Sequence, residues 1–326
     1  VGTNPLTGTV PSLSSQLARR PVAIKITLFP RYVRPQYGLN LADIVFEYYT
    51  EWGLSRFITV FYGNDAEAVG PVRSGRYFDA HVAHMYHAYL VFKFADPRVY
   101  DYLKESDLND FLIVPDNAVG AIYSGPNIID SYNNYFFSTY KFQDFLKRKG
   151  MDNSPQQLRS GYFSILPPGF REDAERIYTH YSVYNYHYWA YDQFLHKYFR
   201  FQETNDTLSG KEANYAPLVD SATSQQVSAD NVVILFVPYT FKNQFDEEDE
   251  VFHVDLFNSG KAYVFRDGIV TPANWWRLSE DQPLVITDTN GAPLPLKPGR
   301  TFYEVIGTTS TFQQDGPNWY FKFGRP

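Results

Sequence analysis

The sequence predicts an α+β protein with a mixed sheet and helices in its N-terminal part and a β-rich C-terminal part. Helix-like spacing of apolar residues is confined to the first 150 positions, whereas alternating or continuous apolar runs occur throughout the chain. Turn signals such as Asp267-Gly268 and Asn290-Gly291 punctuate the last hundred residues. With 326 residues, 18% of them aromatic, the chain is long enough for about two domains with substantial cores.

The first elements form a strand followed by a hairpin. Alternating apolar residues in Pro21–Leu28 predict a half-buried strand. Two further strands, Ile44–Glu51 and Arg56–Tyr62, flank the four-residue loop Trp52–Ser55. In this hairpin Glu51 lies opposite Arg56, which predicts a cross-strand ion pair.

The pattern changes to a helical one at Ser74, where Phe78, Val82, Met85 and Tyr89 follow at spacings of 4, 3 and 4. Ser138 and Gly150 are suitable caps for a further helix over Ser138–Lys149. The remaining elements of this part are predicted at Leu90–Phe94 (strand), Arg98–Glu105 (helix) and Phe111–Val114 (strand).

The second part is predicted to be mostly β. Its expected strands are Arg176–Ser182, Tyr184–Asp192, Lys197–Glu203, Asn231–Tyr239, Val251–Phe257, Ala262–Arg266 and Thr301–Ile306. Asn258–Lys261 is expected to be a hairpin loop. Because Asn205–Asp230 is polar, we place a domain boundary there and expect a linker over 1–19, an α/β domain over 20–204 and a β-rich domain over 205–326.

Composition excludes several classes of protein. The chain has no cysteine, so disulfides, thiolate nucleophiles and Cys-ligated zinc are absent. No window approaches 18 uncharged apolar residues, which excludes a transmembrane helix. The net charge is −7, and residues 161–326 carry 21 acids against 13 bases, so we expect no nucleic-acid role. Up to Asp79 there are seven arginines and one lysine, a bias suited to bidentate contacts with carboxylate or phosphate.

Several ordered blocks resemble the YerB-like lipoproteins, a bacterial family of unknown function (DUF3048). These blocks are Arg20-Pro21-Val22-Ala23-Ile24, Arg34-Pro35-Gln36, Ala42-Asp43-Ile44-Val45-Phe46-Glu47, Gly53-Leu54-Ser55-Arg56-Phe57, Gly70-Pro71-Val72-Arg73-Ser74-Gly75-Arg76, Asp230-Asn231-Val232-Val233, Phe265-Arg266-Asp267-Gly268 and Asn290-Gly291 through Pro298-Gly299. The resemblance spans nearly the whole chain. It implies an N-terminal and a C-terminal family domain, but it brings no established activity.

The resemblance also implies a location outside the cytoplasmic membrane, on a lipid anchor. The chain begins at Val1 without an initiator Met, so we expect the anchoring Cys upstream of Val1. One departure from the family pattern concerns Asn133-Asn134-Tyr135, where many members carry a His-Asn pair. If that His performs chemistry in relatives, this protein has lost it.

The block Gly70–Arg76 precedes a predicted helix, and we identify it as the main candidate site. Free N–H groups and two arginines are suited to holding a carboxylate, phosphate or anionic glycan. The alternative is that Arg73 and Arg76 bridge to Asp43, Glu47, Glu51 or Asp79 and fix the helix on the sheet. The candidate ligand-binding residues are Arg34, Arg56, Arg73, Arg76 and Asn134.

Glu47 and Glu51 suggest a carboxylate pair for glycoside hydrolysis. In a straight strand they share a face but lie roughly 13 Å apart, too far for a dyad formed by these two alone. A hydrolase would therefore need a second carboxylate, such as Asp79 or Asp96. The alternative is that each glutamate is paired with an arginine.

The histidines, the acidic run and the tyrosines have structural alternatives. On a helix His81, His84 and His87 do not converge on one ion, so we expect no metal and no cofactor. Asp246–Glu250 is expected to be a solvated loop rather than a calcium site. Alternation over Tyr184–Tyr191 places Tyr184, Tyr186 and Tyr188 on one face and His187, Trp189 and Tyr191 on the other. The tyrosine face is expected to be buried, or alternatively exposed and able to stack on sugars.

The sequence therefore supports three hypotheses. The first is an extracytoplasmic lipoprotein that binds an envelope glycan or a small anion through an Arg-rich site. The second is an envelope glycan or peptide hydrolase that uses Glu47 or Glu51. The third is a structural or assembly subunit whose Tyr-rich strands contact other proteins. The sequence does not decide the oligomeric state.

Overall fold

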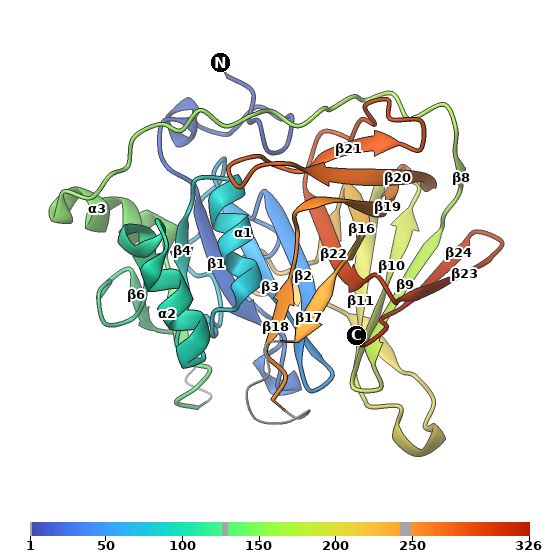
Figure 1. The fold of residues 1–326 in the computed structure, drawn as a ribbon, viewed down its shortest axis with the longest axis horizontal. Helices are drawn as coiled ribbons and strands as arrows, with labels where there is room; N and C mark the ends of the chain where they lie inside the picture. The colour runs from blue at the N-terminus through green and yellow to red at the C-terminus, as the bar shows by residue number, and fades with distance from the viewer. Residues whose placement is uncertain (1, 126–129, 242–248) are drawn as a thin grey trace.

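The computed structural model describes residues 2–125, 130–241 and 249–326 (Figure 1). Its core is a large mixed sheet, with 11 strands in the described part of the chain. In spatial order these are β21 (Val285–Asp288), β20 (Ile269–Arg277), β19 (Asn258–Arg266), β16 (Asn231–Val237), β22 (Thr301–Gly307), β2 (Ile44–Glu51), β3 (Leu54–Phe61), β1 (Val22–Thr27), β4 (Tyr89–Val91) and β5 (Leu112–Ile113), with β8 (Glu172–Asp173) on β20.

A second sheet packs against one face of the large sheet. Its strands are, in spatial order, β12 (Tyr215–Pro217), β11 (Lys197–Glu203), β10 (Asn185–Asp192), β9 (Arg176–Ser182), β24 (Asn318–Lys322) and β23 (Thr311–Asp315), with β15 (Ser228–Ala229) on β11. Three two-strand ribbons complete the β structure: β6 (Ile122–Ser124) with β7 (Tyr135–Phe137), β13 (Val219–Asp220) with β14 (Gln225–Gln226), and β17 (Tyr239–Phe241) with β18 (Phe252–Val254).

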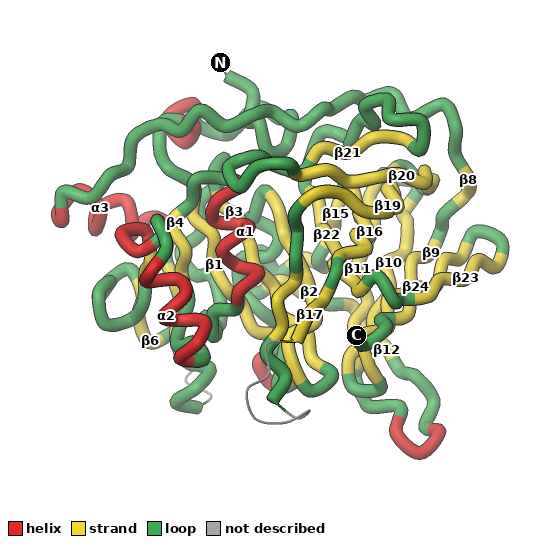
Figure 2. The backbone as a smooth tube through the Cα atoms, in the orientation of Figure 1, coloured by secondary structure: helices red, strands yellow, loops and turns green. Residues whose placement is uncertain are grey.

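The helices gather on one side of the molecule (Figure 2). They are α1 (Tyr77–Met85), α2 (Pro97–Glu105) and α3 (Thr139–Lys149). α1 packs on the face of the large sheet opposite the second sheet, where Phe78 contacts Phe46 and Tyr48 at ring-centroid distances of 5.9 and 4.3 Å. As predicted, Ser138 caps α3 and Gly150 ends it in the left-handed conformation. Among the described residues no helix combines the length and apolarity needed to cross a bilayer.

The two sequence halves share the large sheet. β22 lies between β16 and β2 and runs parallel to both, so C-terminal strands continue directly into N-terminal ones. The second sheet likewise joins β9–β11 to β24, near the end of the chain. The sheets therefore do not divide at residue 205.

Most predicted strands and helices are present, with local corrections. β1 is buried along its whole length rather than half-buried, because it lies inside the sheet between β3 and β4. Asn258–Lys261 is not a loop, since it forms the first half of β19 and pairs with β20. The segment before residue 19 is not a loose linker throughout: Asn4 and Leu6 are buried, and Asn4 donates to Asp43. Of the acidic run, Asp246–Glu248 lies outside the described residues.

Candidate functional site

Glu47 and Glu51 lie on opposite faces of β2, contrary to the straight-strand expectation. The register between β2 and β3 shifts between Tyr49 and Glu51, which is a β-bulge. A bulge inserts one extra residue and so reverses the faces beyond it. Glu47 consequently points toward the second sheet, whereas Glu51 reaches Arg56 on the face covered by α1. These two residues therefore belong to separate sites.

Glu47 forms part of a buried polar cluster between the two sheets. Its carboxylate accepts from Arg200 at 2.6 Å and from Ser55 at 2.6 Å. Glu304, its register neighbour on β22, accepts from Trp189 at 2.5 Å and lies 2.6 Å from Nε2 of His187. The side chains of Glu47, Glu304, His187 and Arg200 are 0% exposed, so in this structure no substrate reaches them.

The inter-sheet cluster contains the one group of potential metal ligands found among the described residues. Ligand atoms of Glu47, His187 and Glu304 all lie within 4.8 Å of one another. The Arg200 guanidinium already supplies a cation there, which leaves little need for a metal ion. Burial opposes ionisation of Glu304, but His187 and Arg200 outweigh burial and lower the pKa of Glu304 to about 2. The cluster is therefore suited to joining the two sheets by charged hydrogen bonds.

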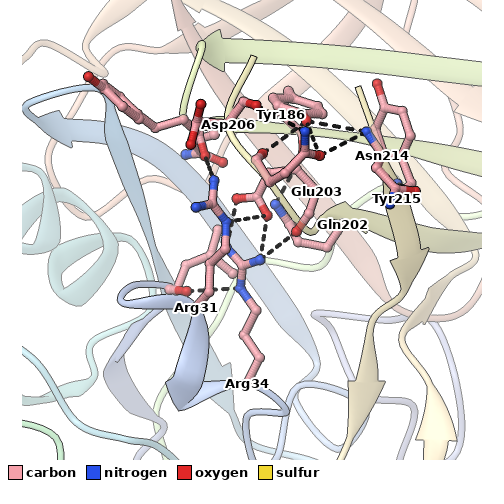
Figure 3. A network of polar contacts seen from close by, with 12 residues as sticks. Arg31, Arg34, Tyr186, Gln202, Glu203, Asp206, Asn214 and Tyr215 are labelled. Atoms are coloured by element: carbon pink, nitrogen blue, oxygen red, sulfur yellow. Dashed lines mark hydrogen bonds and ion pairs between the residues drawn. The ribbon is translucent and has the colours of Figure 1, made fainter. Parts of the chain in front are cut away.

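Arg34 belongs to a second network, in which it and Arg31 approach Glu203 (Figure 3). Its guanidinium binds the buried carboxylate of Glu203 on β11 through two nitrogens and also donates to the Leu28 carbonyl at 3.1 Å. Arg31 lies 3.7 Å from the same carboxylate and donates to the Tyr184 carbonyl at 2.8 Å. This network fixes the loop after β1 to the second sheet, so Arg34 is not free to bind a ligand.

Asp79, the third candidate acid, is buried beneath α1. It accepts from Lys25 at 2.9 Å and from the Tyr48 hydroxyl at 2.6 Å, and it also accepts the backbone N–H of Arg76 at the start of the helix. Burial lowers the pKa of Lys25, and the charges of Arg56 and Arg76 lower it further. Asp79 raises it, but the pKa still falls to about 7. Asp79 is 0% exposed and therefore acts as an internal partner.

Glu51 lies between two arginines, as the alternative interpretation expected. The Arg56 and Arg76 guanidinium groups each approach its Oε1 at 2.6 Å, and Arg76 Nε donates to Oε2 at 2.9 Å. Burial alone would raise the pKa of Glu51, but Arg56 and Arg76 reverse the effect and lower it to about 2. The predicted Glu51–Arg56 ion pair is confirmed, but the predicted register is wrong. The connecting turn has two residues, Trp52 and Gly53, rather than four, and Arg56 lies opposite Tyr48 while Glu51 lies opposite Leu54.

Arg73 is placed beside these residues by backbone pairing. Its N–H donates to the Lys25 carbonyl, and its carbonyl accepts from the Lys93 N–H, both at 3.0 Å. The segment therefore lies between the carboxyl ends of the parallel strands β1 and β4, where ligand sites of α/β sheets occur. We call Glu51, Arg56, Arg73, Arg76 and Lys93 the arginine site.

Arg73 differs from the other arginines of this site. In the part of the chain that the structure describes, its guanidinium has no carboxylate within ion-pair distance, and its buried Nε has no hydrogen-bond partner. Its nearest aromatic neighbour is Tyr132, whose ring centroid is 5.8 Å from Cζ. Lys93, by contrast, donates to the Ser131 carbonyl at 2.7 Å. Arg73 is thus the unsatisfied cation of the arginine site.

A cavity of about 350 Å³ opens beside the arginine site. Glu51, Ser74 and Arg76 line one part of it, and Phe94 and Asp96 line another. Asp249 and Glu250 line it as well, and Arg73 is not among its lining residues. Asp96 and Asp249 share Arg98, and Glu250 pairs with Arg325. With four carboxylates and one guanidinium in its lining, this cavity is not suited to an anion.

Asn134 lies in the loop that covers Arg73, next to β7. The neighbouring Tyr135 carbonyl accepts from the N–H of Val72, and the buried Oδ1 of Asn134 has no hydrogen-bond partner among the described residues. Asp130 anchors the same loop by accepting from Tyr32 and Asn133 at 2.7 and 2.9 Å. Asn134 is therefore near the arginine site, whereas Glu47 and Arg34 are not part of it.

The three histidines predicted on one helix do not converge, and His87 lies beyond the end of α1 with a φ of 48°. His81 Nδ1 lies 2.8 Å from Arg277 on β20, and burial with the Arg277 charge lowers the pKa of His81 to about 3. His84 Nε2 lies 2.8 Å from Asp107, and burial together with Arg20 lowers the pKa of His87. Within the described residues these histidines form no three-ligand metal group.

Sequence reasoning missed the partners that make the charged clusters complete. Arg200, Glu203 and Glu304 lie within β-strands and carry no motif. The one available signal was alternation, since His187 and Trp189 were correctly placed on a common face and both are fully buried. The strand pairings that bring Glu304 to His187 link residues 117 positions apart.

Comparison with known proteins shows one consistent relationship. The N-terminal domain model of the family described as "Protein of unknown function (DUF3048)" matches residues 6–152, and the C-terminal domain model matches residues 177–303. A Bacillus subtilis (strain 168) protein named "Putative lipoprotein YerB" is 25% identical over 309 residues, which cover 93% of this chain and 85% of that protein. The crystal structure of YerB protein from Bacillus subtilis superposes with a TM-score of 0.76 at 23% identity, covering 94% of this chain and 97% of that one. The structural likeness confirms the α+β fold.

Proposed function

Since the chain belongs to the DUF3048 family, whose function is unknown, we propose its activity from the site: it binds an anionic group at the arginine site. The observation that carries the proposal is the guanidinium of Arg73, which lies beside Arg76 and has no ion-pair partner in the part of the chain that the structure describes. The name of the Bacillus subtilis relative supports a lipoprotein attached outside the cytoplasmic membrane. In that setting the ligand is an envelope polymer that carries phosphate or carboxylate.

The charge of the site supports an anion. Lys25, Arg56, Arg73 and Arg76 are four cationic groups close together, and Glu51 and Asp79 are the two carboxylates that ion-pair with three of them. Lys93 adds a fifth cation, and Asp130, close enough to act on Arg73 and Lys93, adds a third carboxylate. Because the pKa of Lys25 is near 7, these groups together carry an excess of between one and two positive charges at neutral pH. A planar guanidinium binds phosphate or carboxylate through two parallel hydrogen bonds, and an anion would satisfy the buried Nε of Arg73.

The test compares binding of a poly(glycerol phosphate) teichoic acid and of inorganic phosphate to the intact chain and to Arg73→Ala. We expect polymer binding that weakens with added salt, and a loss of about tenfold or more in Arg73→Ala, as for removal of a charge-assisted hydrogen bond. The matched control is Arg171→Ala, which removes an exposed arginine elsewhere and should leave the affinity unchanged. Absence of binding, or equal affinity of Arg73→Ala and the parent chain, would refute the proposal.

The hydrolase hypothesis has less support from the geometry. Glu47 and Asp79 are fully buried with cationic partners, and Glu51 and Asp96 are held by arginines. An acid catalyst needs a raised pKa, whereas the pKa of Glu51 is lowered to about 2 by its two arginines despite burial. An anion-binding role needs no such group.

A further inference from the structure

The strand register of the second sheet, whose strands β9, β10, β23 and β24 are labelled in Figure 1, aligns two rows of side chains across its strands. In the first row, register pairs place Gln313, Tyr320, Tyr178, Tyr188 and Phe201 side by side on five strands, β23, β24, β9, β10 and β11. In the second row, Thr311, Lys322, His180 and Tyr186 are neighbours in the same way. A cavity of about 450 Å³, a size typical of small-ligand sites, is lined by Gln313, Tyr320 and Tyr178 of the first row and by all four residues of the second, but not by Tyr188 or Phe201.

The aromatic rings of the first row stack on each other. Ring centroids of Tyr320 and Tyr178 are 4.6 Å apart with planes at 8°, and those of Tyr188 and Phe201 are 4.7 Å apart at 4°. Tyr178 and Tyr188 are 5.1 Å apart at 35°. Rings that stack across strands cover one another's faces and turn their edges outward. Ring edges are the positive part of the aromatic quadrupole, so the exposed surface of this row favours negative charge.

The polar groups of the cavity agree with that preference. Lys322 is exposed and lies beside His180, and none of the described aspartates or glutamates lines the cavity. The hydroxyls of Tyr215 and Tyr320, and the side chains of Gln313 and Thr311, have no hydrogen-bond partner among the described residues. The cavity thus combines several free donors and acceptors with apolar ring edges and a positive charge.

We propose that this cavity, which we call the tyrosine groove, binds a sugar that carries a negative charge. The hydroxyl groups of a sugar match the free polar groups, and its negatively charged substituent matches the positive ring edges. Lys322 pairs with the carboxylate or phosphate of the sugar. The groove lies on the second sheet and contains no residue of the arginine site, so this inference does not rest on the proposed function.

The experiment measures binding of three sugars to the intact chain by titration calorimetry. The sugars are N-acetylmuramic acid, which carries a carboxylate, glucose 6-phosphate, which carries a phosphate, and neutral N-acetylglucosamine. We expect the charged sugars to bind more tightly, and their comparison distinguishes carboxylate from phosphate as the preferred group. Lys322→Gln should weaken binding of the charged sugars about tenfold and leave the neutral sugar unchanged. Tyr320→Ala should weaken binding of all three.

Matched controls separate groove binding from general effects. Lys104→Gln and Tyr140→Ala remove an exposed lysine and an exposed tyrosine on α2 and α3, and both should bind like the parent chain. Tyr320 is 38% exposed, and a parent-like circular dichroism spectrum of Tyr320→Ala would exclude unfolding as the cause of lost binding. Arg73→Ala should also retain sugar binding, which distinguishes the groove from the arginine site. The inference is overturned if no sugar binds, or if Lys322→Gln binds N-acetylmuramic acid as tightly as the parent.

Discussion

Glu51 illustrates how single residues create the arginine site. Its carboxylate holds Arg56 and Arg76 in place and thereby leaves Arg73 as the guanidinium without an acidic partner among the described residues. Two arginines that share one carboxylate are less fully compensated than two separate ion pairs. The residue therefore organises the positive site rather than neutralising it.

The pH dependence of stability should report this role of Glu51. Its folded-state pKa is about 2, below its ordinary value of 4.5, so between these pH values the unfolded chain binds more protons than the folded one. Above pH 4.5 Glu51 makes its full contribution to the free energy of unfolding. This contribution falls as the pH drops toward 2, with a slope of up to about 1.4 kcal/mol per pH unit.

Urea unfolding measured between pH 5 and pH 2.5 tests this expectation. Glu51→Gln should be less stable and should show a shallower slope than the parent chain, because one linked proton is removed. Glu212→Gln, which replaces an exposed acid, should keep the parent slope. An unchanged slope in Glu51→Gln would show that Glu51 is not the linked group.

At the scale of elements, the hairpin of β2 and β3 determines which acid serves which site. The bulge before Glu51 is a shift in strand register, and the tight turn after it needs two residues with positive φ. Trp52 and Gly53 have φ values of 51° and 78°, as in a type I′ turn. The Gly53 carbonyl also accepts from Ser182 at 2.6 Å, so the turn connects the arginine site to the second sheet.

Gly53→Ala should disrupt this connection. A Cβ atom at position 53 would lie 2.7 Å from Oγ of Ser182, and the positive φ is unfavourable for alanine. We expect the free energy of unfolding to fall by about 1–2 kcal/mol, measured by urea denaturation. In the control Gly169→Ala, no atom lies within 4 Å of the added Cβ, and stability should change by less than about 0.5 kcal/mol. Equal stability of the two variants would contradict the assigned turn.

At the scale of the whole molecule, the two family domains are structurally interleaved. β22 supplies a parallel neighbour to β2, and β24 supplies one to β9. The inter-sheet cluster of Glu47, Glu304, His187 and Arg200 adds buried charged hydrogen bonds between the two layers. Separating the halves would leave strand edges unpaired and these charges uncompensated.

A fragment of residues 1–204 should therefore fail to fold independently. It retains β2 and β9–β11 but lacks β22, the partner of β2, and β24, the partner of β9, as well as β16 beyond β22. We expect the intact chain to unfold in one cooperative urea transition, followed by both tryptophan fluorescence and circular dichroism. The fragment should show no such transition. A cooperative transition in the fragment would instead support an independent domain ending near residue 204.

The sequence by itself determined the fold class, most strand and helix positions, the caps of α3 and the cross-strand pair of Glu51 with Arg56. These features depend on local periodicity, capping and turn residues. The tertiary structure decided which charges are free: Glu47 is neutralised by Arg200 and Arg34 by Glu203, whereas Arg73 keeps no acidic partner among the described residues. The ion pairs of Glu47 with Arg200 and of Arg34 with Glu203 join residues more than 150 positions apart and depend on the order of the strands. The separation of Glu47 from Glu51 depends on the bulge in β2. Local sequence patterns specify neither the strand order nor the bulge.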